Sequence, residues 1–291
     1  MNVGFDHELL SSFYLWFDDR LNYFGGAYKS PVEHVFQHVD SVDVPANYLA
    51  YYSPYRQLVW ASDKIAVPSH VTIDGVTVQD RSGIYIDYNQ GRVLVDTAIF
   101  GNNENLDIRG TFAYKTVNTY ITDETEESVI LNSDFTISPI NQTFLQQNGG
   151  FSDKVYTVPA VFLTLSSSNN EPFAFSGLDN TVSNIRSVVV ADSNYTLDGV
   201  LSLFRDSVRS CFSMIDFENF PFGEFSHIKN PPYKYSDLSS ASQSKVFIEE
   251  ARASKLTDRS REKITSSKDY KIGFLDFELS KLRYPRESFS R

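Results

Sequence analysis

The chain has 291 residues, of which 41% are hydrophobic and 14% aromatic, and its formal net charge is -11 at pH 7. This length and composition suffice for one large or two modest hydrophobic cores, and the acidic balance disfavours nucleic-acid binding through phosphate neutralisation. The single cysteine, Cys211, excludes an internal disulfide and a thiolate zinc site. No stretch approaches the ~20 apolar residues of a membrane span, and no basic region precedes an apolar run at the N-terminus. We therefore expect a protein made in a reducing cytoplasm, without a membrane span or a signal peptide.

Residues 7–24 are predicted to form a helix, because large apolar side chains recur there at intervals of three and four. Asp6 is suited to cap its start, and Gly25-Gly26 to end it. Two interpretations of the bulky apolar stripe stay open: it packs on a sheet of the same chain, or part of it contacts a neighbouring subunit. The stripe comprises Leu9, Leu10, Phe13, Trp16, Phe17, Leu21 and Phe24.

Between Tyr48 and about Ile140 the hydrophobic period changes to two, which is typical of strands. The clearest hairpin spans 84–95, where the loop 89–91 ends in a glycine that accepts a positive φ. Residues 111–121 alternate without a break, which is typical of an edge strand or of a subunit-pairing element. The predicted strands are 57–60, 71–78, 84–88, 92–95, 108–121 and 129–131. We interpret this region as a small antiparallel barrel or sandwich inserted after the first helix.

The second half of the chain predicts a sheet with one helix packed on it. Two apolar runs, 158–165 and 184–191, are typical of strands. An amphipathic helix follows from Leu197 to Ile215, with Cys211 on its apolar stripe as a core residue. Residues 245–248 and 272–282 are two later strands, 233–244 is a candidate mobile loop, and 251–267 is charged and polar. The basic C-terminal end, with Arg283 and Arg286, is suited to dock on an acidic neighbour.

The sequence lacks the common catalytic motifs, since it has no glycine-rich phosphate-binding loop and no nucleophile elbow. His34 and His38 would share one face of a helix, as metal ligands do, but no third ligand is near them. We therefore expect no metal site and no cofactor. Carboxylates leave a glycan hydrolase open, because such an enzyme requires two of them about 5–10 Å apart. We expect Asp87 and the acidic run at 124–127 to face solvent instead.

Several stretches resemble structural proteins of tailed bacteriophages. The segments 10–17 (LSSFYLWF) and 25–28 (GGAY) are similar to the opening helix of tail-terminator and neck proteins, and 84–93 (IYIDYNQGRV) resembles a hairpin of virion proteins. The strands at 158–161 and 184–191, the helix to Ile215 and the strand 272–282 follow the strand–strand–helix–strand order of the tail-terminator fold. The resemblance implies an α+β fold, in which residues 1–47 and 151–291 form a tail-terminator-like sheet-plus-helix domain. Residues 48–150 form an inserted antiparallel β-barrel or sandwich, which small terminators lack.

The resemblance also implies rings, commonly of six or twelve copies, without catalytic residues. We therefore expect a non-enzymatic subunit of the phage neck, which joins the head connector to the tail around a DNA channel. Its partners would be further copies of the chain and other connector and tail proteins of the virion, while DNA passes without specific binding because acidic walls repel it. A tail-fibre or baseplate attachment module is the alternative, and a carboxylate-dependent glycan hydrolase is a further one. The residues expected at subunit interfaces are Phe13, Trp16, Phe17, Tyr114, Tyr120, Phe274, Phe277, Arg283 and Arg286.

Overall fold

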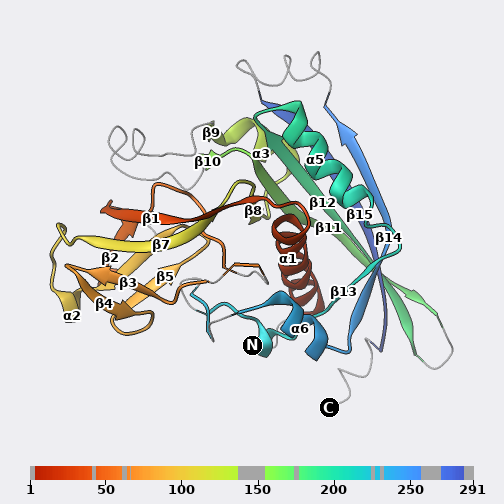
Figure 1. The fold of residues 1–291 in the computed structure, drawn as a ribbon. Coiled ribbons are helices and arrows are strands. Elements are labelled where there is room, and N and C mark those ends of the chain that lie inside the picture. Colours follow the sequence, from red (N-terminus) through yellow and green to blue (C-terminus); the bar gives the residue numbers. More distant parts are fainter. Residues whose placement is uncertain are drawn as a thin grey trace.

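The computed structural model describes residues 4–40, 44–60, 64–65, 67–136, 155–173, 177–223, 227–229, 233–256 and 270–284. The fold is mixed α+β with far more strand than helix, which confirms the predicted class. Two large sheets dominate it, one of six strands and one of seven. Helix α1 (Phe5–Tyr23) lies between them (Figure 1).

The six-stranded sheet contains the long strands of the chain. Its order is β13 (Cys211–Ser213), β14 (Lys245–Lys255), β15 (Lys271–Arg283), β12 (Asp179–Ala191), β11 (Ala160–Pro172) and β8 (Asn118–Ile121). Neighbouring strands are antiparallel, except that β11 and β8 are parallel. Because β11 and β12 have 13 residues each and β8 has 4, the β11–β12 hairpin extends well beyond the end of β8 as a long arm.

The seven-stranded sheet curls into a nearly closed, barrel-like layer. Its order is β4 (Val76–Gln79), β3 (His70–Ile73), β7 (Ile108–Lys115), β1 (Tyr28–His38), β2 (Tyr48–Tyr52), β6 (Arg92–Asp96) and β5 (Ile84–Asp87). The predicted hairpin at 84–95 is confirmed as β5 and β6, and the turn at Asp74-Gly75 joins β3 to β4. Gly91 in the 84–95 hairpin has a φ of 62°, the conformation for which glycine was expected.

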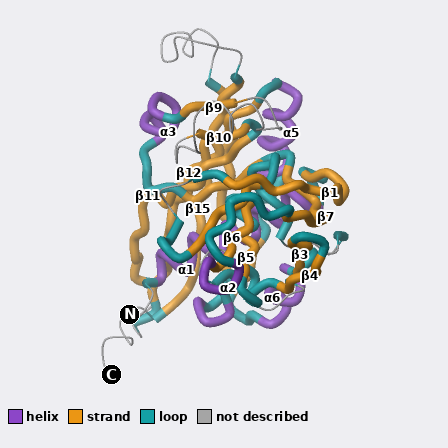
Figure 2. The backbone as a smooth tube through the Cα atoms, turned by 90° about the vertical axis from the view of Figure 1, so that its left-hand side faces the viewer, coloured by secondary structure: helices purple, strands orange, loops and turns teal. Residues whose placement is uncertain are grey.

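Smaller elements complete the described part of the chain. They are α2 (Thr97–Phe100), α3 (Glu126–Asn132), the parallel pair β9 (Asp134–Thr136) and β10 (Val155–Thr157), α5 (Asn194–Arg205), η1 (Phe217–Asn219) and α6 (Tyr235–Ala241). α5 starts where the side chain of Ser193 accepts a hydrogen bond from the Thr196 amide. Figure 2 shows α3 and α5 on opposite sides of the six-stranded sheet. No helix within the described ranges is long and apolar enough to cross a membrane.

The core is an aromatic layer between α1 and the six-stranded sheet. The three-and-four spacing of α1 places Phe13 and Phe17 on one face, and both side chains are fully buried. The Phe13 ring lies 5.0 Å from that of Phe277 on β15, and the Phe17 ring stacks 3.7 Å from that of Phe204 on α5. The first interpretation of the bulky stripe is therefore confirmed for its buried residues, which pack inside their own chain, whereas Phe24 at the end of the stripe is 65% exposed.

Four predicted elements are wrong. Residues 57–60 form only an isolated bridge at Leu58 and not a strand. Residues 111–121 divide into β7 and β8, because the chain bends at 116–117 and β8 joins the other sheet. Residues 129–131 are helical, since Thr125 caps α3 and two glutamates occupy its first turn, where negative charge suits the helix dipole. The helix predicted to Ile215 ends at Arg205, after which Arg209 adopts a φ of 62° and the chain reverses into β13. Cys211 on β13 is consequently exposed and not a core residue.

Further differences concern exposure and domain organisation. The segment 233–244 contains α6 in place of a loop, and His34 and His38 lie on β1 and not on a helix. Asp87 is buried and does not face solvent as predicted. Its carboxylate tolerates burial because it accepts a hydrogen bond from Arg92 at 3.0 Å and from two loop amides. The sheets also divide the chain differently from the predicted boundaries: β1 belongs to the seven-stranded sheet, and β8 belongs to the six-stranded one.

Candidate assembly surface

One face of the six-stranded sheet is covered by helices, and the described residues leave most of the other face uncovered. Side chains alternate along β15, and Phe277 points to the face that packs against α1 and α5. Its neighbours Asp276 and Glu278 therefore lie on the opposite face, together with Arg186 and Arg252, which pair with Asp276 across the strands. We call this side the open face. At one end it is covered by α3, β9 and β10, which pack on a small apolar cluster.

The open face has charged side chains in its central part. Arg186 on β12 forms ion pairs with Asp276 on β15 and with Glu126 on α3, and these hydrogen bonds raise the pKa of its guanidinium. On β14, the Arg252 guanidinium donates a hydrogen bond of 2.6 Å to Glu250. Glu278 is opposite Glu250 in the strand register. Carboxylates thus outnumber guanidinium groups on this face.

Within the part of the chain that the structure describes, the two outer long strands of the sheet each have an unpaired edge. β8 pairs with β11 only over 160–163, so no described strand lies beside the rest of β11 on that side. β13 pairs with β14 only over 245–247, and the backbone at 209–210 extends this contact to Ile248. We call Ser167–Glu171 the β11 edge and Glu250–Lys255 the β14 edge. Both present backbone groups that another strand can bind.

Local irregularities mark where each edge begins. A register shift between Leu165 and Ser167 precedes the β11 edge, and Pro172, which lacks an amide donor, follows it. A second shift, between Ile248 and Glu250, precedes the β14 edge. Such features limit non-specific strand addition, so each edge accepts a partner only over a defined short stretch.

The outer side of β8, in contrast, is closed by a side chain. The Gln57 amide donates to the Thr119 carbonyl and accepts from the Thr119 amide, both at 3.0 Å. These are the two hydrogen bonds that a neighbouring strand would form. Gln57 and Thr119 are both buried. On this side of the sheet, β11 therefore provides the accessible edge and β8 does not.

The expected interface residues fall into three groups: buried aromatic residues, half-buried aromatic residues and two basic C-terminal residues. Phe13, Trp16, Phe17 and Phe277 are at most 7% exposed in the core of their own chain, and side chains without accessible surface cannot contact another subunit. For these four the prediction is wrong. The helical and strand patterns that identified them show that a side chain is buried, but they do not show whether its own chain or another subunit covers it. The half-buried residues are engaged as well: Tyr114 stacks on Tyr55, Tyr120 stacks on Phe162, and Phe274 packs on the small apolar cluster of the open face.

The two basic C-terminal residues differ in what the structure describes. Arg283 donates hydrogen bonds to Thr181 at 2.6 Å and to Asn170 at 3.1 Å, and its guanidinium lies over the Phe5 ring. Arg283 therefore ties the β11–β12 arm to the start of α1 within the chain. Arg286 lies outside the described residues.

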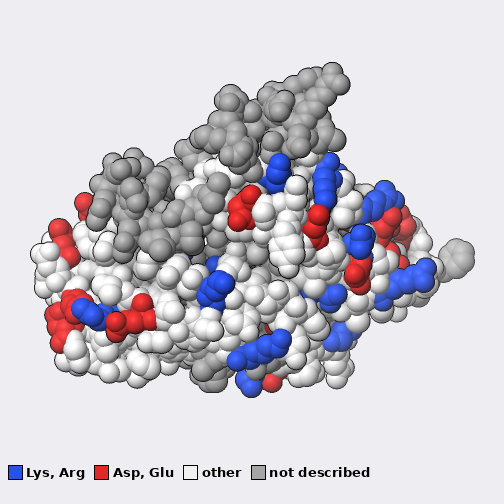
Figure 3. Space-filling view, turned by 45° about the horizontal axis from the view of Figure 1, so that its top comes forward, with Lys and Arg blue, Asp and Glu red and all other residues white. Residues whose placement is uncertain are grey.

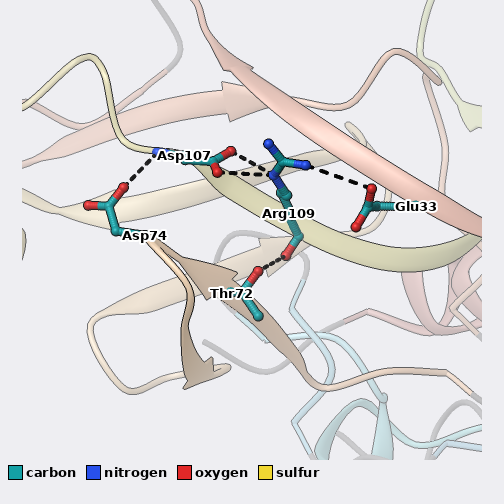
Figure 4. A network of polar contacts seen from close by, with 5 residues as sticks. All are labelled: Glu33, Thr72, Asp74, Asp107 and Arg109. Carbon is teal, nitrogen blue, oxygen red and sulfur yellow. Dashed lines mark hydrogen bonds and ion pairs between the residues drawn. The ribbon is translucent and has the colours of Figure 1, made fainter.

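A second polar cluster lies on the seven-stranded sheet (Figure 4). Arg109 on β7 donates to both oxygens of Asp107, at 2.9 and 3.0 Å, and lies 3.9 Å from Glu33 on β1. The Asp107 amide donates to Asp74, and Arg109 and Glu33 line a shallow hollow of about 280 Å³. One guanidinium engages the carboxylates of Asp107 and Glu33, so this cluster is a surface salt-bridge network.

His34 is a structural residue of the barrel. It is fully buried, with Nδ1 2.7 Å from the Ser53 hydroxyl and Nε2 3.0 Å from the Phe112 carbonyl. Burial lowers the pKa of the imidazole to about 4, so the ring is neutral near pH 7. Among the described residues, no three His, Cys, Asp or Glu side chains gather as metal ligands would.

The surface charges are mixed in the view of Figure 3. Lys and Arg are interspersed with Asp and Glu, and acidic groups gather at the end formed by the seven-stranded sheet. The described residues on that face do not form the continuous basic patch by which nucleic-acid-binding proteins hold phosphates.

Sequence reasoning did not identify Glu171 and Arg252, which lie on the two edges. Glu171 follows a polar run that resembles a loop, and Arg252 lies in a charged segment that was not assigned to a strand. The weak signal for the latter was Val246 and Ile248, whose alternation continues past a bulge to Ala251. Comparison with protein-family models finds no match to the chain, and a search of curated proteins finds none either.

Proposed function

We propose that this chain is a non-enzymatic structural subunit of the head–tail connector of a tailed bacteriophage. Copies of it form a closed ring, of six or twelve subunits, that joins the head connector to the tail around a DNA channel. The proposal rests on the resemblance in strand and helix order. The observation that carries it is that, among the described residues, the six-stranded sheet has an unpaired stretch at each of its two edges. A sheet that can accept a strand at both sides can be continued from copy to copy.

The open face is suited to line the channel. It carries the acidic side chains Glu250, Asp276 and Glu278, while the other face of the sheet is occupied by α1 and α5. DNA moves past such a wall without adhering, because carboxylates repel its phosphates and release no counterions. Other connector and tail proteins of the virion would bind at the rims of the ring.

Native mass spectrometry of the purified protein, alone and with candidate connector proteins, tests this proposal. We expect a closed assembly of six or twelve copies, either alone or on a partner. A protein that stays monomeric under all these conditions would contradict the proposal. A trimer would instead favour the attachment module of a tail fibre or baseplate.

A further inference from the structure

We infer that neighbouring copies pair edge to edge, with the β11 edge of one copy against the β14 edge of the next and with Glu171 opposite Arg252. This inference rests on the proposed ring and names its subunit contact. The occupant of each edge is a second copy of the chain, because the two edges match each other in length, strand direction and charge.

The two edges are similar in length. The β11 edge has the five residues from Ser167 to Glu171, and the β14 edge has the six residues from Glu250 to Lys255. Neither contains a proline, so every residue keeps its backbone donor. A pairing of four or five residues is a normal length for neighbouring strands.

Strand direction also matches. β11, β12, β15 and β14 alternate in direction across the sheet, because each neighbouring pair is antiparallel. β11 and β14 of one copy therefore run in opposite directions. When a second copy is placed beside the first by the rotation of a ring, its β11 is antiparallel to the β14 that it meets. The contact continues the alternation of the sheet, and the same surface pair can repeat around the ring.

Side-chain alternation limits the possible registers, because the open faces of both copies must coincide. Asn169 and Glu171 lie on the open face of the β11 edge, and Glu250, Arg252 and Ser254 lie on that of the β14 edge. Allowed registers therefore differ by steps of two residues.

Charge selects one of these registers. Placing Glu171 opposite Glu250 sets like charges against each other, which destabilises a strand pair. Moving Glu171 opposite Arg252 creates an opposite-charge pair and sets Asn169 opposite Ser254, two compatible polar groups. A further step sets Glu171 opposite Ser254 and forms no ion pair. The Arg252 side chain is 72% exposed, so it can reach a carboxylate of the next copy.

The selected register staggers adjacent copies. Within one chain Arg252 on β14 is the register partner of Asp276 on β15. Glu171 on β11 is the partner of Asn180 on β12, which in turn is the partner of Leu282 on β15. The difference of six residues on β15 corresponds to about 20 Å along the strands, while the four long strands span ~19 Å across the sheet. Strands joined in this way run at about 45° to the ring axis, close to the tilt of closed barrels.

Engineered cysteines test the pairing directly. Cys211→Ser removes the only cysteine of the chain, and Glu171→Cys with Arg252→Cys then places one thiol on each edge. Within one chain these positions lie at opposite edges of the sheet, three strand spacings apart, too far for a disulfide. Mild oxidation is expected to link different chains into a ladder that ends at the size of the ring, as seen on a non-reducing gel.

Matched variants provide the controls. Glu171→Cys with Glu250→Cys tests the neighbouring register and should give about tenfold less linked product, since a disulfide requires Cα atoms within about 7 Å. Equal yields from both pairs would overturn the register. Glu171→Arg alone and Arg252→Glu alone should each weaken the assembly in native mass spectra, and the two together should restore it. Arg205→Glu, an exposed substitution on α5, should leave it unchanged.

The outcomes separate this inference from the proposed function. If a closed ring forms but the thiols at 171 and 252 never link, the edge pairing is overturned and the proposed ring function still stands. A protein that remains monomeric at every concentration and with every partner would overturn both.

Discussion

Replacing Lys115 with methionine is expected to destabilise the protein by about 3–4 kcal/mol, because it leaves a carboxylate buried without its counterion. Lys115 on β7 lies with Nζ 2.7 Å from Oδ1 of Asp18 on α1, and both side chains are 0% exposed. The pair joins the helix to the barrel. The Asp18 carboxylate also accepts a hydrogen bond of 2.9 Å from Asn22.

The loss of stability in Lys115→Met has an upper bound, because Asp18 can bind a proton when its counterion is removed. Burial already raises the pKa of Asp18 and lowers that of Lys115, in each case because it disfavours the charged form. Without the ammonium, Asp18 can escape the penalty by binding a proton. From an ordinary value of 3.8, binding that proton at pH 7 costs about 4 kcal/mol. The loss in Lys115→Met should therefore shrink by about 1.4 kcal/mol for each unit that the pH falls toward 4.

Urea unfolding followed by tryptophan fluorescence measures the effect, since both tryptophans, Trp16 and Trp60, are buried. Protein concentration must be held constant because assembly adds to apparent stability. The double variant Asp18→Asn with Lys115→Met should recover part of the loss, as it removes both charges. A loss below about 1 kcal/mol in the single variant, or a loss of equal size at pH 5 and pH 7, would refute this reasoning.

Two further predictions follow from single residues. His34 has a pKa of about 4 in the native state against an ordinary 6.5, so its contribution to stability is full above pH 6.5 and declines as the pH falls toward 4, by about 3 kcal/mol in total. His34→Gln should flatten the pH dependence of the unfolding free energy over that range, whereas His70→Gln, at an exposed position, should retain it. Gly91→Ala should lower the unfolding free energy by about 2–5 kcal/mol, because the new Cβ would lie 2.4 and 2.7 Å from two backbone carbonyl oxygens at a positive φ. Gly26→Ala has a similar φ with no atom within 4 Å, so a loss as large as that of Gly91→Ala in denaturant titrations would contradict the steric argument.

The sequence by itself determined the elements whose signal is local. The three-and-four spacing of large side chains predicted α1, and the loop ending in Gly91 predicted the hairpin of β5 and β6. Two apolar runs likewise predicted β11 and β12, and the alternation over 272–282 predicted β15. Each of these patterns is a property of neighbouring residues, so it survives without knowledge of the rest of the fold.

Only the tertiary structure decided which strands pair and which side chains are buried together. Alternation shows that a strand has two faces, but it does not identify the neighbour, so the transfer of β8 to the six-stranded sheet was not visible. The Asp18–Lys115 pair joins residues 97 positions apart, and the closure of β8 by Gln57 spans 62. The unpaired edges of β11 and β14 follow from the same cause: an edge is defined by the strand that is missing beside it, which is a long-range property of the sheet.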